Sequence, residues 1–267
     1  MKHTSIANFI SVLALLLFLS ESILAQTTEI AAHRGANHLA PENTKAAAQA
    51  AIDLGVEYIE IDVRKSRDGV HFIIHDLRVN RTTDGSGFVS EMTASQLRKL
   101  DAGSWYENGD FAGEPIPELY DYLKWIKGEA KVYFDVKSAD WDTLYAYVKE
   151  FEIQDEAFFN FFSKRKARKF KEQFPDLHIK VNSYSSDPED LRKTIKKYNA
   201  SVIEIRPEHM NGDLKKVAEE ENVRLMVYAK ENSEKEFRQI IKFAPAIVNL
   251  DRPALFVKLR TLATNKK

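Results

Sequence analysis

The segment Tyr58–Asp76, YIEIDVRKSRDGVHFIIHD, contains two carboxylates and a histidine whose spacing could build a reactive site. Glu60 and Asp62 are two residues apart, so on a strand their side chains leave the same face, with Cα atoms about 7 Å apart. Both could then bind one metal ion. Asp68-Gly69, between two apolar runs, is a strong signal for a two-residue hairpin turn. That turn would set Asp62 opposite His75, and cross-strand partners share a face.

This hairpin is a candidate active site, and the alternative is an edge hairpin that carries only solvated charges. A two-residue turn joins antiparallel strands, so the run from His71 to His75 must fold back on the first arm. We therefore predict that His75 lies beside Asp62 on the hairpin and does not end a barrel strand of its own. His71 lies nearer the turn, where a solvated or substrate-rim position is expected.

The elements that must position this hairpin follow a regular alternation. Short apolar, β-branched or aromatic runs are followed by amphipathic segments of helical length, which is typical of βα units around a parallel sheet. Without the returning arm, eight strands remain, the number in a (β/α)8 or TIM barrel, an α/β fold. They are expected at residues 29–34, 58–64, 131–137, 157–162, 178–183, 201–206, 224–229 and 246–250.

Helices are expected between these strands from their spacing and capping residues. The interval 77–116 is different, because it has no long periodic segment and mixes Gly, Asp, Ser and aromatic residues. We predict a small insertion there, after the second strand hairpin, at the C-terminal face where barrel elaborations lie with the active site, and interpret it as a substrate-side cap. The helices are expected at residues 45–54, 117–127, 140–151, 164–173, 188–197, 212–221, 233–242 and 253–263.

The composition is that of an ordinary globular protein, with 44% hydrophobic and 30% charged residues and a formal net charge of -1. This balance favours neither nucleic acid nor a membrane surface as a partner. The absence of cysteine excludes disulfides and leaves any metal site to oxygen and nitrogen ligands. The oligomeric state is left open.

The N-terminus has the pattern of a processing segment. Lys2 precedes an apolar run over residues 10–19, and a short polar stretch leads to the small residue Ala25. This pattern is typical of a secretory signal, and the apolar run is too short to span a bilayer comfortably. We therefore expect a signal peptide over residues 1–25 and a single exported domain, periplasmic or secreted, over 26–267. An uncleaved N-terminal anchor is the alternative.

The end of the first expected strand adds further reactive groups. His33 and Arg34 would face the same barrel mouth as the two carboxylates. Gly35 would let a substrate approach the backbone closely. Taken alone, His33 could be a packed core histidine and Arg34 a surface charge. Asn43 and Thr44 are interpreted as a turn with a helix cap.

Several motifs follow one another in a fixed order: AHRGANHLAPENT, YIEIDVRKSRDG, FIIHD, RTTDGSG, TASQLRKLDAGSW, PIPEL and YFDVK. Together they closely resemble the glycerophosphodiester phosphodiesterase family. The resemblance covers essentially the whole chain after the expected signal peptide and is densest from Ala31 to Lys137. Motifs in a fixed order are more specific than any lone motif. The resemblance implies a TIM barrel with a divalent-metal site that hydrolyses small glycerophosphodiesters to sn-glycerol 3-phosphate and an alcohol.

The resemblance also implies roles for single residues. The family's two catalytic histidines fall on His33 and His75, and its phosphate-binding arginine falls on Arg34. A further basic residue of the site falls on Lys137. The two histidines, on opposite sides of the phosphorus, could divide the proton transfers near neutral pH. Which one is the acid stays open, as does the choice between water and a neighbouring substrate hydroxyl as nucleophile.

The family's metal-binding carboxylates fall on Glu60, Asp62 and Asp135. Three crowded carboxylates repel one another unless a cation lies among them, and hard oxygen ligands select one Mg2+ or Ca2+ ion. Asp135 stands where the family usually has Glu, so the ion could be shifted or reached through a water. Tyr228 stands near the place of a frequent family tryptophan. Asp251, in VNLDRP, resembles a closing signature and is expected to be structural.

Two other functions remain as alternatives. One is a related phospholipase that acts on intact phospholipids or sphingolipids, which would need an exposed apolar rim around the mouth. The polar character of the insertion argues against such a rim. The other is a catalytically inert secreted barrel that binds a phosphorylated ligand, but the candidate histidines and carboxylates are all present.

Overall fold

The structure is a computed structural model that describes residues 28–264. The predicted signal peptide, residues 1–25, lies outside the described residues. No helix within the described range is both long and apolar enough to cross a membrane.

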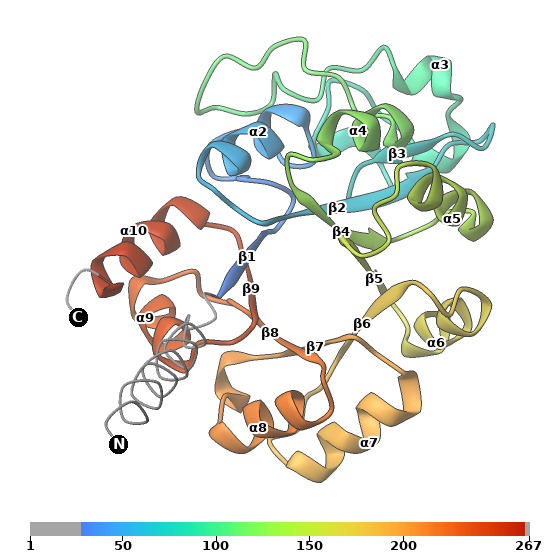
Figure 1. The fold of residues 1–267 in the computed structure, drawn as a ribbon. Coiled ribbons are helices and arrows are strands. Elements are labelled where there is room, and N and C mark those ends of the chain that lie inside the picture. The colour runs from blue at the N-terminus through green and yellow to red at the C-terminus, as the bar shows by residue number, and fades with distance from the viewer. Residues whose placement is uncertain (1–27, 265–267) are drawn as a thin grey trace, which may run out of the picture.

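Eight parallel strands form a closed ring, which confirms the predicted TIM barrel (Figure 1). The ring closes because the first strand pairs in parallel with both the second and the last. Each strand lies within two residues of its predicted bounds. The strands are β1 (Glu29–Ala32), β2 (Tyr58–Lys65), β4 (Lys131–Val136), β5 (Ala157–Phe161), β6 (His178–Asn182), β7 (Val202–Ile205), β8 (Arg224–Tyr228) and β9 (Ile247–Leu250).

One helix follows each strand or hairpin and covers the outside of the ring (Figure 1). Side-chain caps fix the start of several helices; Thr44, Asp140 and Ser163, for example, accept backbone N–H groups of the first turn. The helices are α2 (Lys45–Asp53), α4 (Leu119–Ile126), α5 (Trp141–Glu150), α6 (Lys164–Gln173), α7 (Pro188–Tyr198), α8 (Gly212–Glu220), α9 (Glu234–Phe243) and α10 (Pro253–Thr264).

Side chains that point into the barrel form two layers. An apolar layer near the amino ends of the strands includes Tyr58, Tyr133 and Phe158, with the last two rings stacked at 4.4 Å. Because side chains alternate along a strand, the residues two positions further on point inward as well. These are polar: Glu60 follows Tyr58, and Asp135 follows Tyr133. The apolar layer thus closes the barrel beneath a polar layer at the carboxyl ends.

The hairpin forms, but its register differs from the prediction. The arm β3 (His71–Ile73) pairs antiparallel with β2 and does not enter the closed ring. Val63 pairs with Ile73, so the position opposite Asp62 belongs to Ile74, whose N–H donates to the Asp62 carbonyl at 2.8 Å. The predicted pairing of Asp62 with His75 is therefore wrong by one residue.

The turn explains the shift. Ser66 N–H donates to the Val70 carbonyl, so three residues form the loop where two were predicted. The Ser66 hydroxyl also accepts from Val70 N–H and donates to the Asp68 carboxylate. Gly69 at the third loop position has φ +92°, the left-handed conformation typical of a three-residue hairpin. The extra residue moves every later pair by one.

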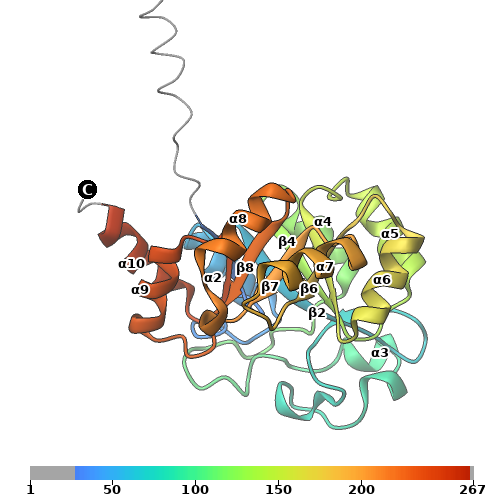
Figure 2. The ribbon, with the colours of Figure 1, turned by 90° about the horizontal axis from the view of Figure 1, so that it is seen from below.

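The insertion 77–116 has a small hydrophobic core of its own, which includes Val79, Val89 and Leu97 and packs on Phe72 of β3. It contains the short helix α3 (Ala94–Leu97) and two 3-10 turns, Val79–Arg81 and Val89–Glu91. Figure 2 shows the insertion towards one end of the barrel, and Figure 1 shows it beside β3 and α4, away from the centre of the ring. The insertion predicted as a substrate-side cap therefore lies beside the ring, next to β3 and α4, and not over its centre (Figure 1).

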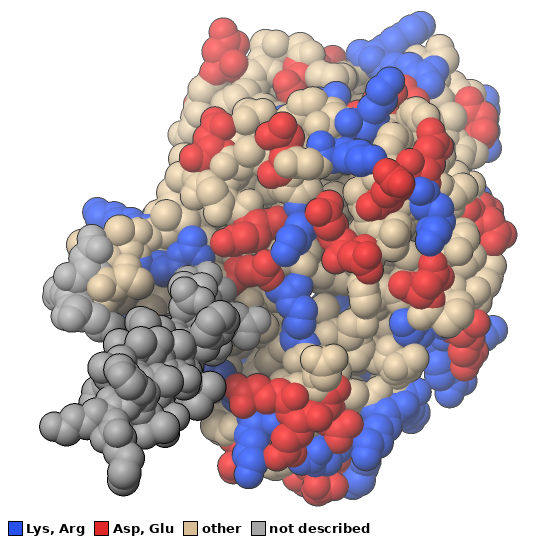
Figure 3. Space-filling model, in the orientation of Figure 1, with Lys and Arg blue, Asp and Glu red and all other residues tan. Residues whose placement is uncertain are grey.

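Charged residues of both signs are mixed on the face shown in Figure 3. Glu29, Lys131 and Arg224 are the first residues of β1, β4 and β8. Glu29 forms ion pairs with Lys131, at 2.8 Å, and with Arg224. No single sign dominates that face, in agreement with the net charge of -1.

Candidate active site

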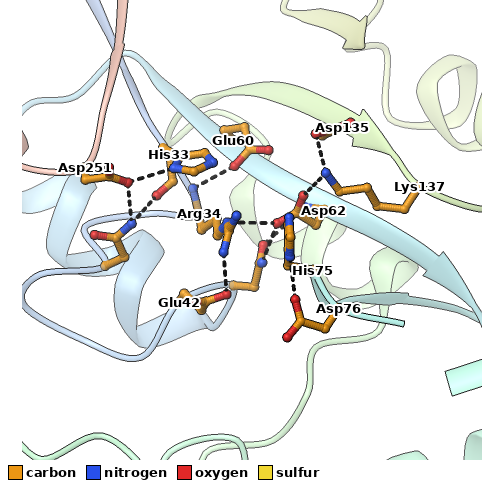
Figure 4. A network of polar contacts seen from close by, with 12 residues as sticks. His33, Arg34, Glu42, Glu60, Asp62, His75, Asp76, Asp135, Lys137 and Asp251 are labelled. Carbon is orange, nitrogen blue, oxygen red and sulfur yellow. Dashed lines mark hydrogen bonds and ion pairs between the residues drawn. The ribbon is translucent and has the colours of Figure 1, made fainter. Parts of the chain in front are cut away.

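The polar layer brings three predicted metal ligands together at the carboxyl ends of β2 and β4 (Figure 4). Asp62 pairs directly with Asp135 across the parallel ladder, and Glu60 lies two residues before Asp62 on the same face. Each of the three offers an oxygen that lies within 4.8 Å of the others. Burial, together with the charge of Asp62, raises the pKa of Glu60 to about 8.

This cluster has the properties of a site for a hard divalent cation. Asp62 is buried, and the ammonium of Lys137, at 3.0 Å, is the polar group that the structure places against its Oδ1, so this oxygen has a lone pair available for a cation. All donors are oxygens, which Mg2+ and Ca2+ prefer. Among the described residues, Glu60, Asp62 and Asp135 are the one group of such ligands that meets this spacing. The residues present therefore fit the cation that the motif resemblance implies.

Lys137 lies between two of these carboxylates. Its ammonium nitrogen is 2.6 Å from Oδ2 of Asp135 and 3.0 Å from Oδ1 of Asp62. Burial alone would lower the pKa of Lys137, but the two carboxylates outweigh it and raise the pKa above its usual value. Burial alone would likewise raise the pKa of Asp62, which Lys137 and Arg34 instead lower. The predicted substrate-binding lysine thus also neutralises the carboxylate cluster.

Arg34 is held at the mouth by three carboxylates. Its backbone N–H donates to Glu60 at 2.7 Å, and its guanidinium donates to Glu42 at 2.9 Å and lies 3.4 Å from Asp62. Its φ of +59° is unusual for a residue with a side chain. Such backbone strain persists only where surrounding contacts require it, and here the three carboxylates supply those contacts.

Gly35 has a packing role that was not predicted for it. A Cβ atom at this position would lie 2.8 Å from the backbone of Ala47, in helix α2. Gly35 also has φ +80°. The glycine therefore lets α2 approach the loop that carries His33 and Arg34. The approach of a substrate to its backbone stays a prediction.

His33 follows β1 and is oriented by Asp251, which follows β9. Nδ1 of His33 lies 2.7 Å from the Asp251 carboxylate, which also accepts from Asn37 and Asn232. Burial alone would lower the pKa of His33, but the hydrogen bond to Asp251 and the negative charges of Glu60 and Asp251 together outweigh it, and the pKa is raised. Asp251, predicted to be structural, thus positions a catalytic candidate. Tyr228 packs edge-on against the His33 ring at 5.9 Å.

His75 has an equivalent arrangement from a different part of the chain. Its Nδ1 lies 2.6 Å from the carboxylate of Asp76, which Arg81 of the insertion binds at 2.7 Å. The hydrogen bond from Arg81 is the main reason that the pKa of Asp76 is lowered to about 2. Arg81 also binds Glu42, the partner of Arg34. The predicted strand pairing of His75 with Asp62 was wrong by one residue, but His75 still lies close to Asp62 at the mouth (Figure 4).

Two further predictions need correction. Asn43 is more than part of a turn, because its amide donates to the Asp62 carboxylate at 2.7 Å and accepts from Asp62 N–H at 3.2 Å. Thr44 caps α2 as predicted. His71 is buried, and its Nε2 accepts from Asp140 N–H at 2.9 Å, so the predicted solvated position is wrong.

The sequence reasoning missed three supporting residues, Glu42, Asp76 and Arg81. Their signal was present in the motifs PENT, FIIHD and RTTDG, where an acid or arginine stands one to eight residues from a predicted site residue. Spacing alone could not show that Arg81 binds both Glu42, the partner of Arg34, and Asp76, the partner of His75.

A pocket of about 370 Å³ extends from this cluster across the barrel mouth. His33, Glu60 and Asp135 line one side, and residues of β6 to β9 line the other. The mouth therefore combines a candidate cation site, fixed positive charges and two carboxylate-bound histidines with room for a small molecule. Such a site can bind an anionic ester and move protons at it.

Residues 33–255 match the Glycerophosphoryl diester phosphodiesterase family. A glycerophosphodiester phosphodiesterase of Caldanaerobacter subterraneus subsp. tengcongensis is 36% identical over 160 residues, 57% of this chain and 65% of that protein. One of Bacillus subtilis is 34% identical over 116 residues, 41% of this chain and 40% of that protein. The matched regions thus span less than two thirds of these curated relatives.

Solved structures show the same similarity along nearly the whole chain. The glycerophosphodiester phosphodiesterase of Agrobacterium tumefaciens superposes with a TM-score of 0.80 and 34% identity, and the match covers 86% of this chain and 99% of that one. An Oleispira antarctica phosphodiesterase, solved in complex with the product sn-glycerol-3-phosphate, has a TM-score of 0.76 at 23% identity, covering 89% and 97%. The second match supports the fold.

Proposed function

This chain belongs to the glycerophosphoryl diester phosphodiesterase family, and we propose that it hydrolyses glycerophosphodiesters to sn-glycerol 3-phosphate and an alcohol. One observation carries the proposal: three carboxylates, an arginine, a lysine and two carboxylate-bound histidines converge at one barrel mouth. Hydrolysis of a phosphodiester requires neutralisation of the phosphoryl charge and two proton transfers. The carboxylates, the arginine and the lysine are suited to handling the phosphoryl charge, and the two histidines are suited to the proton transfers.

Charge at the phosphoryl group is handled by fixed groups. A divalent cation, Mg2+ or Ca2+, held by Glu60, Asp62 and Asp135, would neutralise negative charge that builds up on the phosphoryl oxygens. Arg34 donates to a phosphoryl oxygen from a guanidinium already oriented by Glu42. Lys137 adds a second positive charge at the same edge.

The two histidines move the protons. Because Nδ1 of each ring is bound to an aspartate, Nε2 is left to face the substrate. One Nε2 accepts a proton from the attacking hydroxyl as the new P–O bond forms. The other donates a proton to the alcohol oxygen as the old P–O bond breaks. The attacking hydroxyl belongs to water or to the neighbouring carbon of the glycerol group, with water then opening the cyclic phosphate.

The test is a release assay on the purified protein. It would be given glycerophosphocholine, glycerophosphoethanolamine and glycerophosphoinositol, with and without EDTA, beside His33→Ala and His75→Ala variants. His178→Ala is the matched control, because His178 begins β6 at the opposite end of the barrel and bonds Ser201. Turnover that survives EDTA or both substitutions would contradict the mechanism. No turnover of any diester would favour a binding barrel.

A second candidate is a phospholipase that acts on intact lipids, and one observation favours it. Four of the exposed large apolar side chains lie in loops that follow β1, β3, β5 and β6, on the mouth side of the barrel: Leu39, Leu77, Phe162 and Tyr184. Phe162 is 98% exposed. Release of head group from phospholipid vesicles faster than from the deacylated diester would select this function.

We also propose that the protein is exported. The support is the N-terminal pattern, in which an apolar run follows a basic residue and ends before small Ala25. N-terminal sequencing of the protein recovered from its native host should begin at Gln26. A mature chain that begins at Met1 would contradict export with cleavage.

A further inference from the structure

The side of the pocket formed by β6, β7 and β9 is built mostly from residues outside the motifs that carry the family resemblance; Asn249, in VNLDRP, is the exception. We call this side the far wall, and it consists of Lys180, Asn182, Glu204, Arg206 and Asn249, on or directly after β6, β7 and β9. Because inward positions alternate, these residues continue the polar layer that contains Glu60 and Asp135 around the ring.

The far wall contains a buried ion pair. Nζ of Lys180 lies 3.0 Å from the Glu204 carboxylate and donates to the Asn182 amide oxygen at 2.8 Å. Lys180 is 3% exposed and Glu204 is 9% exposed. A buried pair of this kind is commonly no more stable than apolar side chains of the same size. Its polar atoms, aimed into a pocket, are therefore more readily explained by binding than by stability.

Asn249 provides an independent observation. It is 4% exposed, lines the pocket, and its Oδ1 has no hydrogen-bond partner among residues 28–264. A buried acceptor without a donor is unfavourable in a folded protein. A hydroxyl group of a ligand would supply the missing donor. The pocket that Lys180, Asn182 and Glu204 line thus also contains an unused acceptor.

The far wall is poorly suited to a quaternary ammonium group. Lys180, Arg206 and Lys230 carry three positive charges on this side, against one negative charge on Glu204. Recognition of such cations normally uses free aromatic faces. The guanidinium of Arg206 already lies 5.1 Å from the ring centre of Tyr184. The Tyr228 ring is packed against His33.

The pocket is also larger than a three-carbon group requires. Its volume of about 370 Å³ corresponds to about twelve waters at about 30 Å³ each. It lies at the lower end of the range for sites that enclose a complete small molecule, about 300 to 1,000 Å³. A ring-sized alcohol with several hydroxyl groups would fit this space and match its donors and acceptors.

We propose that the far wall binds the alcohol half of the substrate and selects a polyhydroxylated, neutral or anionic alcohol, such as glycerol, a cyclitol or a sugar, over a quaternary ammonium alcohol. This inference rests on the proposed hydrolysis of glycerophosphodiesters. A site that hydrogen-bonds substrate hydroxyls rejects analogues that lack them, because its buried polar groups are then left without partners.

The first test compares kcat/KM for glycerophosphoinositol and glycerophosphoglycerol with that for glycerophosphocholine. The wild-type protein should prefer the polyol diesters by at least about tenfold. Asn249→Leu, and separately Arg206→Gln, should lower kcat/KM for the polyol diesters by about tenfold or more and change that for glycerophosphocholine by less than about threefold. Arg206 is half exposed, so its variant tests the wall without disturbing the core.

The matched control is Lys216→Gln, an exposed lysine on α8 that pairs with Glu220, and it should change neither value. Equal or faster turnover of glycerophosphocholine by the wild type would overturn the inference. An equal loss of kcat/KM for all diesters in the far-wall variants would also overturn the inference, because the far wall would then bind the glycerol half that all the diesters share. Thermal unfolding of each variant separates loss of binding from loss of fold.

A binding measurement distinguishes this inference from the proposed function. In the His75→Ala variant with Mg2+, calorimetry should show tighter binding of glycerophosphoinositol than of glycerophosphocholine, and Asn249→Leu should remove the difference. If no diester is hydrolysed by the wild type but this difference is found, the proposed function fails and the far-wall assignment stands. If the diesters are hydrolysed but bind equally, the assignment fails and the proposed function stands.

Discussion

At the scale of single residues, the site is defined by carboxylates with different partners. Asp251 and Asp76 bind Nδ1 of a histidine, Asp62 and Asp135 bind the ammonium of Lys137, and Glu60 accepts a backbone N–H. Asp251 is far from His33 in the sequence and Asp76 directly follows His75, yet both bind Nδ1, and within the described part of the chain no hydrogen bond occupies Nε2 of either ring. The remaining carboxylates provide the oxygens of the candidate cation site.

We predict that Asp251→Asn shifts the pH dependence of hydrolysis. Burial lowers the pKa of His33 and the hydrogen bond to Asp251 raises it, so loss of the carboxylate charge must lower the pKa. The limb of the kcat/KM profile that reports His33 should therefore move to lower pH, and kcat should fall about tenfold to a hundredfold. A pH-rate profile measures both effects. An unchanged limb beside a normal Asp176→Asn surface control would contradict the role of Asp251.

We predict that Lys137→Met strengthens divalent-cation binding while it slows hydrolysis. The ammonium lies at ion-pair distance from two of the three candidate ligands, so it competes with a cation for their oxygens. Its removal should raise cation affinity by about tenfold, the effect of one nearby charge. Calorimetric titration with Mg2+ and Ca2+ tests this, with Lys216→Met as the control. Weaker cation binding in the Lys137 variant would show that the lysine does not compete.

At the scale of elements, three connections place the site. The loop after β1 carries His33 and Arg34 against α2, the three-residue hairpin loop sets the register of β3, and the insertion supplies Arg81. The hairpin and the insertion share the apolar contacts around Phe72, so the insertion supports the segment that carries His75. The close packing of the β1 loop on α2 depends on Gly35.

We predict that Gly35→Ala destabilises the protein more than Gly69→Ala does. Both glycines have positive φ, +80° and +92°, so an L-residue costs about 1 to 2 kcal/mol at either position. A Cβ at Gly35 would also lie 2.8 Å from Ala47, whereas nothing lies within 4 Å of a Cβ at Gly69. The difference in the free energy of unfolding should be about 2 kcal/mol or more. Urea denaturation measures it, and equal losses would contradict the close approach.

At the scale of the whole molecule, the closed ring makes one site from strands that are far apart in sequence. Contacts between His33 and Asp251 join the first and last strands across 218 positions. The candidate ligands lie on β2 and β4, which are separated by the hairpin arm, the insertion and α4. An unfolded chain would not hold these carboxylates within bonding distance of one ion.

Divalent cations should therefore stabilise the folded barrel. A ligand that binds only the folded state at about 100 times its Kd adds about 2.7 kcal/mol to the free energy of unfolding. Thermal unfolding should show a higher Tm with Mg2+ or Ca2+ than with EDTA, and Asp135→Asn should reduce the increase. Asp213→Asn, in the first turn of α8, is the matched control. An unchanged Tm at saturating cation would contradict a cation site made by folding.

The sequence by itself determined the barrel and the main reactive groups. Alternating strand and helix patterns located every strand of the ring within two residues, because hydrophobic periodicity and capping are local properties. The spacing of Glu60 and Asp62 predicted a shared face, and the structure brings both to the mouth. Motif order connected His33, His75 and Asp135 with them.

Only the tertiary structure decided how these groups are held. The hairpin register depended on a side-chain hydrogen bond of Ser66, and the role of Gly35 on its contact with Ala47. The partnership of His33 with Asp251 and the far wall around Asn249 depend on strands that meet when the ring closes. Local periodicity carries no information about such contacts, because they are set by the closure of the ring and by the packing of side chains within it.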